Sequence, residues 1–425
     1  MPEYKRKKSH TGRPKRQNPE VVVSEDIKVK RPKKTKNNIA EEENIRVVRG
    51  KKGEKRKKLL IFAAVIVAVS LLLAVLSAVL PVGLFESAQD FFLSLGSGNF
   101  PAEISGTTVV NCVPKGNYYY VLTDTSIMAF SNGGKKIFSY IHGFSTPVIV
   151  TSETRALVFD QGKNSAVIYN LAGIVDNIET KGAILTADIA KDGEYAFATK
   201  SESYASSVLV YNRKGKSLYS VNFAKDLVNH IDIASSGKKI AVSTVNSEGG
   251  KMVSCVRVYN FNKADPDYKL DLGQDIAYDI ENTGKGFFVA THDKIRFINW
   301  SKYTVSDYGF EGGLSAVRYS NSGVLALYNK TNDKSDNNVI LFSNSGKKIT
   351  EFEIKGVVND IRFAKGCVYS LGDSKIEIFD KKGKNLRNGT CGFGGIRLVA
   401  AGSNTVCIIT DSEIQKTEIK KGDKA

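Results

Sequence analysis

Short apolar runs and polar turns alternate along the chain beyond residue 100, and this pattern predicts strands joined by tight turns. One phrase recurs: apolar residues at every second position, an aromatic residue, a small polar residue and a Gly-Lys turn. It is found at residues 126–137, 208–218, 339–349 and 376–386. Residues two apart pack on the same face, and glycine supplies the positive φ that the turn needs. Each copy therefore predicts a β-hairpin.

A second phrase precedes these hairpins and consists of an apolar strand, a turn with glycine and another apolar strand. Its copies lie at residues 186–199, 230–244, 278–291, 316–328 and 360–371. A unit with both phrases holds four strands, and the distance from Gly346 to Gly383 gives a period of 37 residues. Four-stranded units of about 40 residues in series are typical of a β-propeller. The predicted fold class is therefore all-β.

Eight such units can be counted in the predicted propeller, which spans residues 100–421. They start near Thr107, Ser145, Ala183, Leu227, Asp275, Gly313, Gly356 and Gly392. The last unit supplies three strands, and the extended run Phe100–Ser105 is expected to complete it, which closes the ring and covers two sheet edges. An outermost closing strand brings the chain in from the side of the hairpin turns. Seven blades are the alternative, because the repeats near Val175 and Asp275 are degenerate.

Upstream of the repeats, residues 59–82 form an apolar segment, and a helix over 59–80 would cover ~33 Å, enough to cross a bilayer core. Acidic residues come first after the segment, at Glu86, Asp90 and Glu103. Basic residues come directly before it, at Lys51, Lys52, Lys55, Arg56, Lys57 and Lys58. This asymmetry predicts a single-pass helix with a cytoplasmic N-terminus and an extracytoplasmic C-terminal domain. A cleaved signal peptide is the alternative, and its charged region would have to be 58 residues long.

Positive charge is concentrated in the N-terminal tail. The whole chain has a formal charge of +17, and residues 1–58 hold 21 Lys or Arg against 8 Asp or Glu. The tail has no apolar stripe, so we expect it to be disordered. Because it lies beside a predicted anchor and has few aromatic residues, we expect it to contact anionic lipid of the bilayer rather than nucleic acid. Residues 83–99 are expected to form a juxtamembrane linker.

Residues able to carry catalysis or bind a metal are scattered along the chain. The histidines His142, His230 and His292 lack the spacing of a helical zinc site, and neither a P-loop nor a Gly-x-Ser-x-Gly motif occurs. Five cysteines lie apart; most are expected to be small core residues, and one disulfide through Cys391 or Cys407 stays open. No catalytic residue, metal site or cofactor is therefore expected.

The segment His142–Pro147 is the best candidate for a binding function, because it falls at a connection between two predicted blades. In that role the ring of Phe144 would stack on a ligand. The side chains of His142 and Ser145 would form hydrogen bonds with it.

The strand that follows begins and ends with charged residues, Arg155 and Asp160. In a binding site, Arg155 would contact an anionic group. The alternative is a structural role in which Arg155 and Asp160 form an ion pair between blades. Tyr204 is expected on the rim, as a packing or binding aromatic residue.

The most distinctive stretches of the chain are Leu122–Thr125, His142–Pro147 and Arg155–Asp160. Together with the order of basic tail, apolar segment and propeller, they resemble a bacterial family of single-pass membrane proteins of unknown function, over about residues 50–420. At fold level the chain also resembles quinoprotein-like and WD-like propellers, although it has one tryptophan, Trp300, and no Trp-Asp dipeptide. The resemblance implies an architecture and no activity.

Two functions from different classes follow from this architecture. The first is a non-catalytic extracytoplasmic binding or scaffold module for a protein or an envelope ligand. The alternative is a hydrolase or lyase that acts on envelope glycans, with Asp188, Asp232 or Asp279 in the central channel. These acids recur at equivalent positions of successive units, which favours a structural role for them and thus the binding module.

Overall fold

The computed structural model describes residues 82–420 except 332 and 393, together with the helical positions Leu60, Ile61, Ala63, Ala64 and Val67. The chain divides into two compact units, Met1–Val69 and Ser70–Ala425. The predicted tail (1–58) and nearly all of the predicted membrane segment (59–82) lie outside the described residues. Within the described part, none of the helices has both the length and the apolar character that crossing a bilayer requires.

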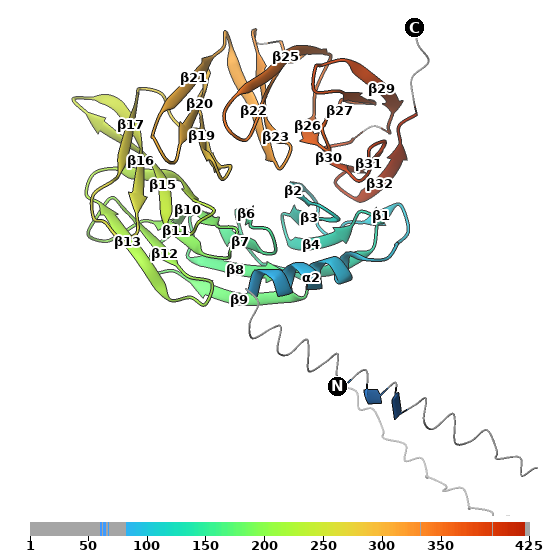
Figure 1. Cartoon of the computed structure of the whole chain (residues 1–425), viewed down its shortest axis with the longest axis horizontal. Coiled ribbons are helices and arrows are strands. Elements are labelled where there is room, and N and C mark those ends of the chain that lie inside the picture. Colours follow the sequence, from blue (N-terminus) through green and yellow to red (C-terminus); the bar gives the residue numbers. More distant parts are fainter. Residues whose placement is uncertain are drawn as a thin grey trace, which may run out of the picture. The chain divides into compact units, whose positions relative to one another are not determined.

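The second unit contains a ring of eight four-stranded antiparallel sheets, the blades of a propeller, shown in Figure 1. Blade 1 holds β2 (Val109–Lys115), β3 (Tyr118–Thr123), β4 (Ser126–Ser131) and β5 (Lys136–Ile141). Blade 2 holds β6 (Pro147–Thr151), β7 (Ala156–Asp160), β8 (Ser165–Asn170) and β9 (Gly173–Glu179). Blade 3 holds β10 (Ile184–Ile189), β11 (Tyr195–Thr199), β12 (Ser206–Tyr211) and β13 (Ser217–Phe223). Blade 4 holds β14 (Leu227–Ile233), β15 (Lys239–Glu248), β16 (Lys251–Asn260) and β17 (Tyr268–Gly273).

The second half of the ring repeats this arrangement. Blade 5 holds β18 (Asp279–Asn282), β19 (Gly286–Ala290), β20 (Lys294–Asn299) and β21 (Val305–Gly309). Blade 6 holds β22 (Gly313–Ser320), β23 (Gly323–Asn329), β24 (Asp336–Phe342) and β25 (Lys348–Lys355). Blade 7 holds β26 (Asp360–Ala364), β27 (Cys367–Leu371), β28 (Lys375–Phe379) and β29 (Asn385–Thr390). The predicted eight-bladed, all-β fold is confirmed, and the alternative of seven blades is wrong.

Blade 8 is closed by both ends of the propeller. Its three C-terminal strands are β30 (Arg397–Ala400), β31 (Thr405–Ile409) and β32 (Glu413–Glu418), and β1 (Ala102–Glu103) is the outermost strand. Ala102 pairs with Ile414, and Glu103 pairs with Glu413. The closing strand was expected within Phe100–Ser105, and two of those residues form it.

The antiparallel order of the strands gives the ring two distinct faces. In each blade the first strand is innermost, and first strands of neighbouring blades contact one another around the central channel. The turns between first and second strands and between third and fourth strands lie at one end, here called the hairpin face. The turns between second and third strands, and the connections between blades, lie at the other end, here called the connection face.

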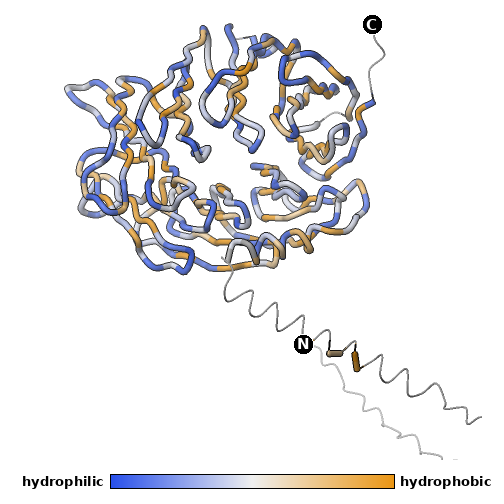
Figure 2. Tube along the Cα trace, in the orientation of Figure 1, coloured by the Kyte–Doolittle hydropathy of each residue, from blue (hydrophilic) through white to orange (hydrophobic). Residues whose placement is uncertain are grey.

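Apolar side chains fill the space between neighbouring blades. Every residue of β3, β7, β11 and β19 is buried, because each second strand is covered on both faces of its sheet. Between blades 1 and 2, for example, Tyr120 packs in one cluster with Val158 and Tyr169. Figure 2 shows hydrophobic residues in orange along the strands and hydrophilic residues in blue in most turns.

The recurring Gly-Lys turn requires glycine for two physical reasons. Gly346 and Gly383 have φ angles of 77° and 83°, a region that residues with a Cβ rarely adopt. A Cβ at Gly346 would also overlap the ring of Phe297, and one at Gly383 would overlap the ring of Phe352. The turn therefore needs glycine both for its backbone and for its close approach to the preceding blade.

Helix α2 (Val82–Ser94) occupies most of residues 83–99, expected as a linker, and lies along one side of the ring in Figure 1. The helix contacts turns of blades 1 to 3 on the hairpin face. An outermost closing strand was expected to bring the chain in from this face. Lys135 Nζ donates hydrogen bonds to the carbonyl oxygens of Leu93 and Leu95, both at 3.2 Å, and so satisfies acceptors at the end of the helix. The Gly98 N–H donates to the carbonyl oxygen of Gly133 at 3.0 Å and continues the contact.

Candidate functional site

Glu86 on helix α2 is enclosed by two arginines from different blades. Its side chain is 9% exposed, and its Oε1 lies 2.8 Å from Nη2 of Arg155, in the β6–β7 turn. Arg213, in the β12–β13 turn, forms a second ion pair with Oε2, to which Thr154 also donates a hydrogen bond at 2.7 Å. Burial alone would raise the pKa of Glu86, but hydrogen bonds from Arg155, Arg213 and Thr154 outweigh it and lower the pKa to about 2. An ionised Glu86 therefore ties the helix to blades 2 and 3.

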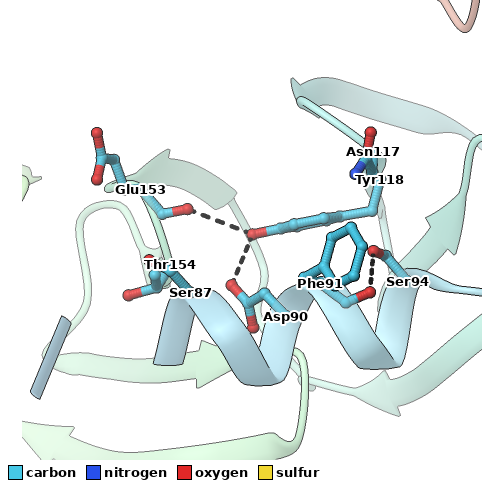
Figure 3. A pocket seen from close by; sticks show the side chains of 8 residues that line it. All are labelled: Ser87, Asp90, Phe91, Ser94, Asn117, Tyr118, Glu153 and Thr154. Atoms are coloured by element: carbon cyan, nitrogen blue, oxygen red, sulfur yellow. Dashed lines mark hydrogen bonds between the residues drawn. The ribbon is translucent and has the colours of Figure 1, made fainter. Parts of the chain in front are cut away.

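Asp90 lies one helical turn after Glu86 and meets blade 1, as Figure 3 shows. Tyr118 Oη donates a hydrogen bond to Asp90 Oδ2 at 3.1 Å, and Asp90 is 6% exposed. Burial raises the pKa of Asp90 to about 7. A cavity of about 240 Å³ beside this contact is lined by Ser87, Asp90, Phe91, Ser94, Asn117, Tyr118, Glu153 and Thr154.

Replacing Asp90 with asparagine is expected to strengthen the docking of helix α2 at neutral pH, by about 1–3 kcal/mol. The pKa of Asp90 is raised in the folded protein. Its contribution to the stability of the docked helix is therefore fully present below pH 3.8, the ordinary pKa, and is lost as pH rises to about 7. Glu86 has the opposite shift, so its contribution is present above 4.5 and is lost as pH falls toward about 2.

The measurement is hydrogen exchange of residues 82–94 as a function of pH, corrected for the intrinsic exchange rate. The wild-type helix should lose protection as pH rises from about 4 to about 7, and Asp90→Asn should not. Asp192→Asn, at an exposed position of the same face, is the control. Equal losses of protection in the wild type and in Asp90→Asn contradict the prediction.

Four of the residues predicted to bind a ligand lie together on the connection face. The His142 ring has Nε2 3.1 Å from the carbonyl oxygen of Thr123, and its Nδ1 accepts the Phe144 N–H at 3.0 Å. The rings of His142 and Phe144 stack with centroids 5.2 Å apart. Asp160 accepts the N–H groups of Ser145 and of the next residue, at 3.0 and 2.7 Å. These bonds shape the connection between blades 1 and 2.

Asp124 repeats the role of Asp160 one blade earlier. It accepts the N–H groups of Thr107 and Thr108, at 2.9 and 3.3 Å, just before the first strand of blade 1. Asp124 follows the second strand of blade 1, and Asp160 ends the second strand of blade 2. Each accepts N–H groups of the connection that leads into its own blade. The distinctive sequence of this region therefore reflects turn geometry.

Arg155 and Tyr204 lie apart from these four residues. Arg155 precedes β7 on the hairpin face and Asp160 ends it on the connection face, so that about 17 Å of strand separates them. In place of the expected alternative, an ion pair between Arg155 and Asp160, the structure has Arg155 paired with Glu86. Tyr204 is 44% exposed in the β11–β12 turn of the connection face.

The first strands carry acidic residues in one part of the ring and basic residues in the part next to it. Corresponding positions, each paired with the start of its second strand, are acidic in blades 3 to 5 and basic in blades 6 and 7. They are Asp188, Asp232, Glu281, Arg318 and Arg362. Burial raises the pKa of Asp188 to about 6 and that of Glu281 to about 8. Burial lowers the pKa of Lys115, in blade 1, to about 8, although the negative charge of Glu281 acts to raise that pKa.

Several of these acids form hydrogen bonds to the backbone of the next blade. Asp188 Oδ2 accepts the N–H of Ile233 at 2.7 Å, and Asp232 Oδ2 accepts the N–H of Asn282 at 3.0 Å. Such bonds join blade 3 to blade 4 and blade 4 to blade 5. They give Asp188 and Asp232 a structural role in the ring. The expected equivalence of Asp279 is wrong, because Glu281 holds the corresponding position of blade 5 and Asp279 lies two residues earlier, where it pairs with Ala290 at the end of β19. Burial raises the pKa of Asp279, the third candidate acid, to about 7.

The cysteines are free thiols, so the disulfide left open for Cys391 or Cys407 is not formed. Cys112, Cys255 and Cys407 are buried, and Cys367 and Cys391 are half-buried. In the described part of the chain, His, Cys, Asp and Glu side chains nowhere gather in a group of three that would hold a metal ion.

Blades 3 to 5 expose apolar side chains on the connection face. Tyr204, Leu227 and Tyr278 are 44%, 45% and 49% exposed there. The β15–β16 hairpin of blade 4 extends beyond Leu227. Leu227 pairs with Val245, whereas β15 and β16 go on pairing as far as Glu248 and Lys251. We call Tyr204, Leu227, Tyr278 and the hairpin tip (residues 246–253) the blade 3–5 surface.

The sequence matches the model of one protein family, DUF5711, described as a family of unknown function, over residues 101–419. This range covers the whole propeller from its closing strand to its last strand. A comparison with curated proteins gave no match.

Solved structures with the same fold include the Dos1 propeller and the C-terminal WD40 domain of Sif2. The Dos1 propeller has a TM-score of 0.53 and 12% identity, with 76% of this chain and 96% of that chain covered. The Sif2 domain has a TM-score of 0.52 and 11% identity, with 77% and 100% covered. BamB from Moraxella catarrhalis has a TM-score of 0.49 and 10% identity, with 76% and 99% covered. At 11–12% identity, the likeness to the Dos1 and Sif2 propellers shows a shared fold alone.

Proposed function

The chain belongs to DUF5711, a family of unknown function, and from that premise we propose that it is a membrane-anchored propeller that binds a protein partner outside the cytoplasm. The partner would sit on the connection face, at the blade 3–5 surface. The proposal assigns no catalytic step to the propeller. The apolar segment at residues 59–82 would be the anchor, and the basic tail would stay in the cytoplasm.

One observation carries the proposal: helix α2 is docked on the hairpin face of the propeller. Helix α2, which directly follows the apolar segment, is fixed to the hairpin face through Glu86, Arg155 and Arg213. An anchor upstream of α2 would then hold the hairpin face toward the membrane. The connection face, with its exposed tyrosines, would be free for a partner.

The composition of the blade 3–5 surface fits a protein interface. Tyrosine is enriched at the centres of interfaces, because it buries a large apolar ring and keeps a polar end. Tyr204 and Tyr278 are both about half exposed, and Tyr278 has the ring of His292 at 6.3 Å as a neighbour. Charged residues of both signs, Glu248 and Lys251, are exposed at the hairpin tip of the same surface.

Photocrosslinking in living cells tests the binding face. A photoreactive phenylalanine analogue at Tyr204 or Tyr278 is expected to give one discrete crosslinked product of higher mass. The matched control is Leu218, which is 42% exposed but lies near the hairpin face, and should not give that product. No product at either tyrosine, or the same product at Leu218, would overturn the assignment of the connection face.

External protease on cells without their wall tests the topology. Trypsin is expected to cut the exposed β23–β24 turn, at Lys330 or Lys334, and to leave the tail before residue 58 intact. Cleavage of the turn only after the membrane is permeabilised would contradict the extracytoplasmic location. A tag at each end of the chain identifies the fragments.

A further inference from the structure

Helix α2 is amphipathic in the reverse of the usual sense. Its face toward the propeller carries Glu86, Asp90 and Ser94, spaced four residues apart and each at most 7% exposed. Its outward side carries Phe85 and Phe92, which are 49% and 69% exposed. A surface helix of a globular protein normally buries its apolar stripe and exposes its polar one.

The two outward phenylalanines lie on one side of the helix, with Ala88 and Gln89 between them. Phe85 and Phe92 are seven residues apart, two helical turns, so they lie on the same side of α2 about 10 Å apart along its axis. Leu95, 49% exposed, follows the end of the helix, and Phe91, 51% exposed, lines the cavity beside Asp90. A helix with apolar rings exposed on one side can lie in the interfacial layer of a membrane with that side among the lipids.

Position in the chain indicates what covers these rings. Helix α2 begins at Val82, and the uncharged run 59–80 ends two residues earlier. If that run spans a bilayer, as the proposed function holds, Phe85 follows the membrane boundary within about two helical turns. A membrane surface is then the nearest apolar phase to the exposed rings.

The charge of the neighbouring turns is complementary to anionic lipid. Lys136, Lys191, Lys214 and Lys216 are exposed at the hairpin face of blades 1 and 3, two of the three blades on which α2 docks, and Lys191 also pairs with Glu153 of blade 2 at 3.0 Å. Lysine near a bilayer is attracted to negatively charged headgroups, and the attraction falls off within a Debye length. The same face thus offers apolar rings and cations side by side.

We infer that the outward face of helix α2 lies in the interfacial layer of an anionic bilayer, with Phe85 and Phe92 among the lipids and the hairpin-face lysines against their phosphates. Because Glu86 holds α2 rigidly on the propeller, this contact fixes the tilt of the whole ring. The inference rests on the proposed membrane anchorage and adds an orientation to it.

The test uses the full chain reconstituted in vesicles of phosphatidylcholine with about a third phosphatidylglycerol. A photoreactive phenylalanine analogue replaces Phe92 in one variant and Tyr204, on the connection face, in the other. After irradiation, mass spectrometry of the peptides should find lipid adducts at Phe92 several-fold more often than at Tyr204. The yield at Phe92 should fall in vesicles of phosphatidylcholine alone.

Flotation of the vesicles separates the two proposals. If the protein does not float with the vesicles, both membrane anchorage and this inference are overturned. If it floats and Phe92 gives a crosslinked dimer or no lipid adduct, the inference alone is overturned, and a second copy or a protein covers the rings. Equal adduct yields in both lipids overturn the role of the lysines.

Discussion

Replacing Glu86 with glutamine is expected to release helix α2 while the propeller stays folded. The change leaves Arg155 and Arg213 without their carboxylate, and the loss of one partner of a buried ion pair costs about 3–5 kcal/mol. At the lower end this weakens docking by about two orders of magnitude. Hydrogen exchange of residues 82–94 measures the release, and thermal unfolding reports on the ring.

Glu103→Gln is the matched control, because it makes the same isosteric change at an exposed carboxylate in the closing strand, away from α2. It should leave the protection of the helix unchanged. Wild-type protection of residues 82–94 in Glu86→Gln would show that apolar contacts, and not the ion pairs, hold the helix. The orientation inferred for the propeller would then lose its physical basis.

Replacing Asp360 with alanine is expected to destabilise the whole ring by about 3–5 kcal/mol. Its side chain is fully buried and lies 3.2 Å from Nη2 of Arg318 and 3.0 Å from Nε of Arg362. It also accepts the N–H of Leu398 at 3.0 Å and so joins blades 6, 7 and 8. Alanine would leave two cations and one buried N–H without their acceptor.

Thermal and urea unfolding measure this loss, which should appear as a fall in the melting temperature on the order of 5 °C. Asp360→Asn keeps an oxygen for the Leu398 N–H and should lie between alanine and the wild type. The control is Asp271→Ala, whose carboxylate is 73% exposed and pairs with Lys269 at the surface; exposed pairs contribute about 1 kcal/mol or less. Similar melting temperatures for Asp360→Ala and the control contradict the prediction.

The fold was predictable from local sequence because each strand pair carries its own signal. The phrase at 339–349 alternates apolar residues and then turns at Gly346, and the structure has β24 and β25 there with Gly346 at φ 77°. Neighbouring units repeat the phrase, so their number followed from counting. Even the closing strand could be expected, since the last unit lacked a fourth strand.

Helix α2 could not be predicted by the same reasoning, because its pattern violates the rule that buried helix positions are apolar. Glu86 and Asp90 were interpreted as acidic residues after a membrane segment, which is how they look without their partners. The arginines that neutralise Glu86 come 69 and 127 residues later, in turns of separate blades. The one local signal was the four-residue spacing of Glu86, Asp90 and Ser94.

The candidate binding residues were predicted from proximity in sequence, and the fold separates them. A strand carries Arg155 and Asp160 to opposite faces, so one end joins α2 and the other shapes a connection between blades. His142, Phe144 and Ser145 do lie together, but both ring nitrogens of His142 and the backbone N–H groups of Phe144 and Ser145 are used in local hydrogen bonds. The exposed Tyr204 is the residue of that set that the proposed partner surface retains.

The two-residue closing strand has a mechanical consequence for a tethered protein. Tension applied through the N-terminal segment would reach the docked helix before it reaches Ala102 and Glu103, which hold blade 8 shut by their pairing with β32. The Glu86 ion pairs would carry the load first, and the shortest strand of the ring would be shielded from it. Force from a wall or a partner that pulls on the propeller would then strain the contacts of helix α2 before it could separate β1 from β32.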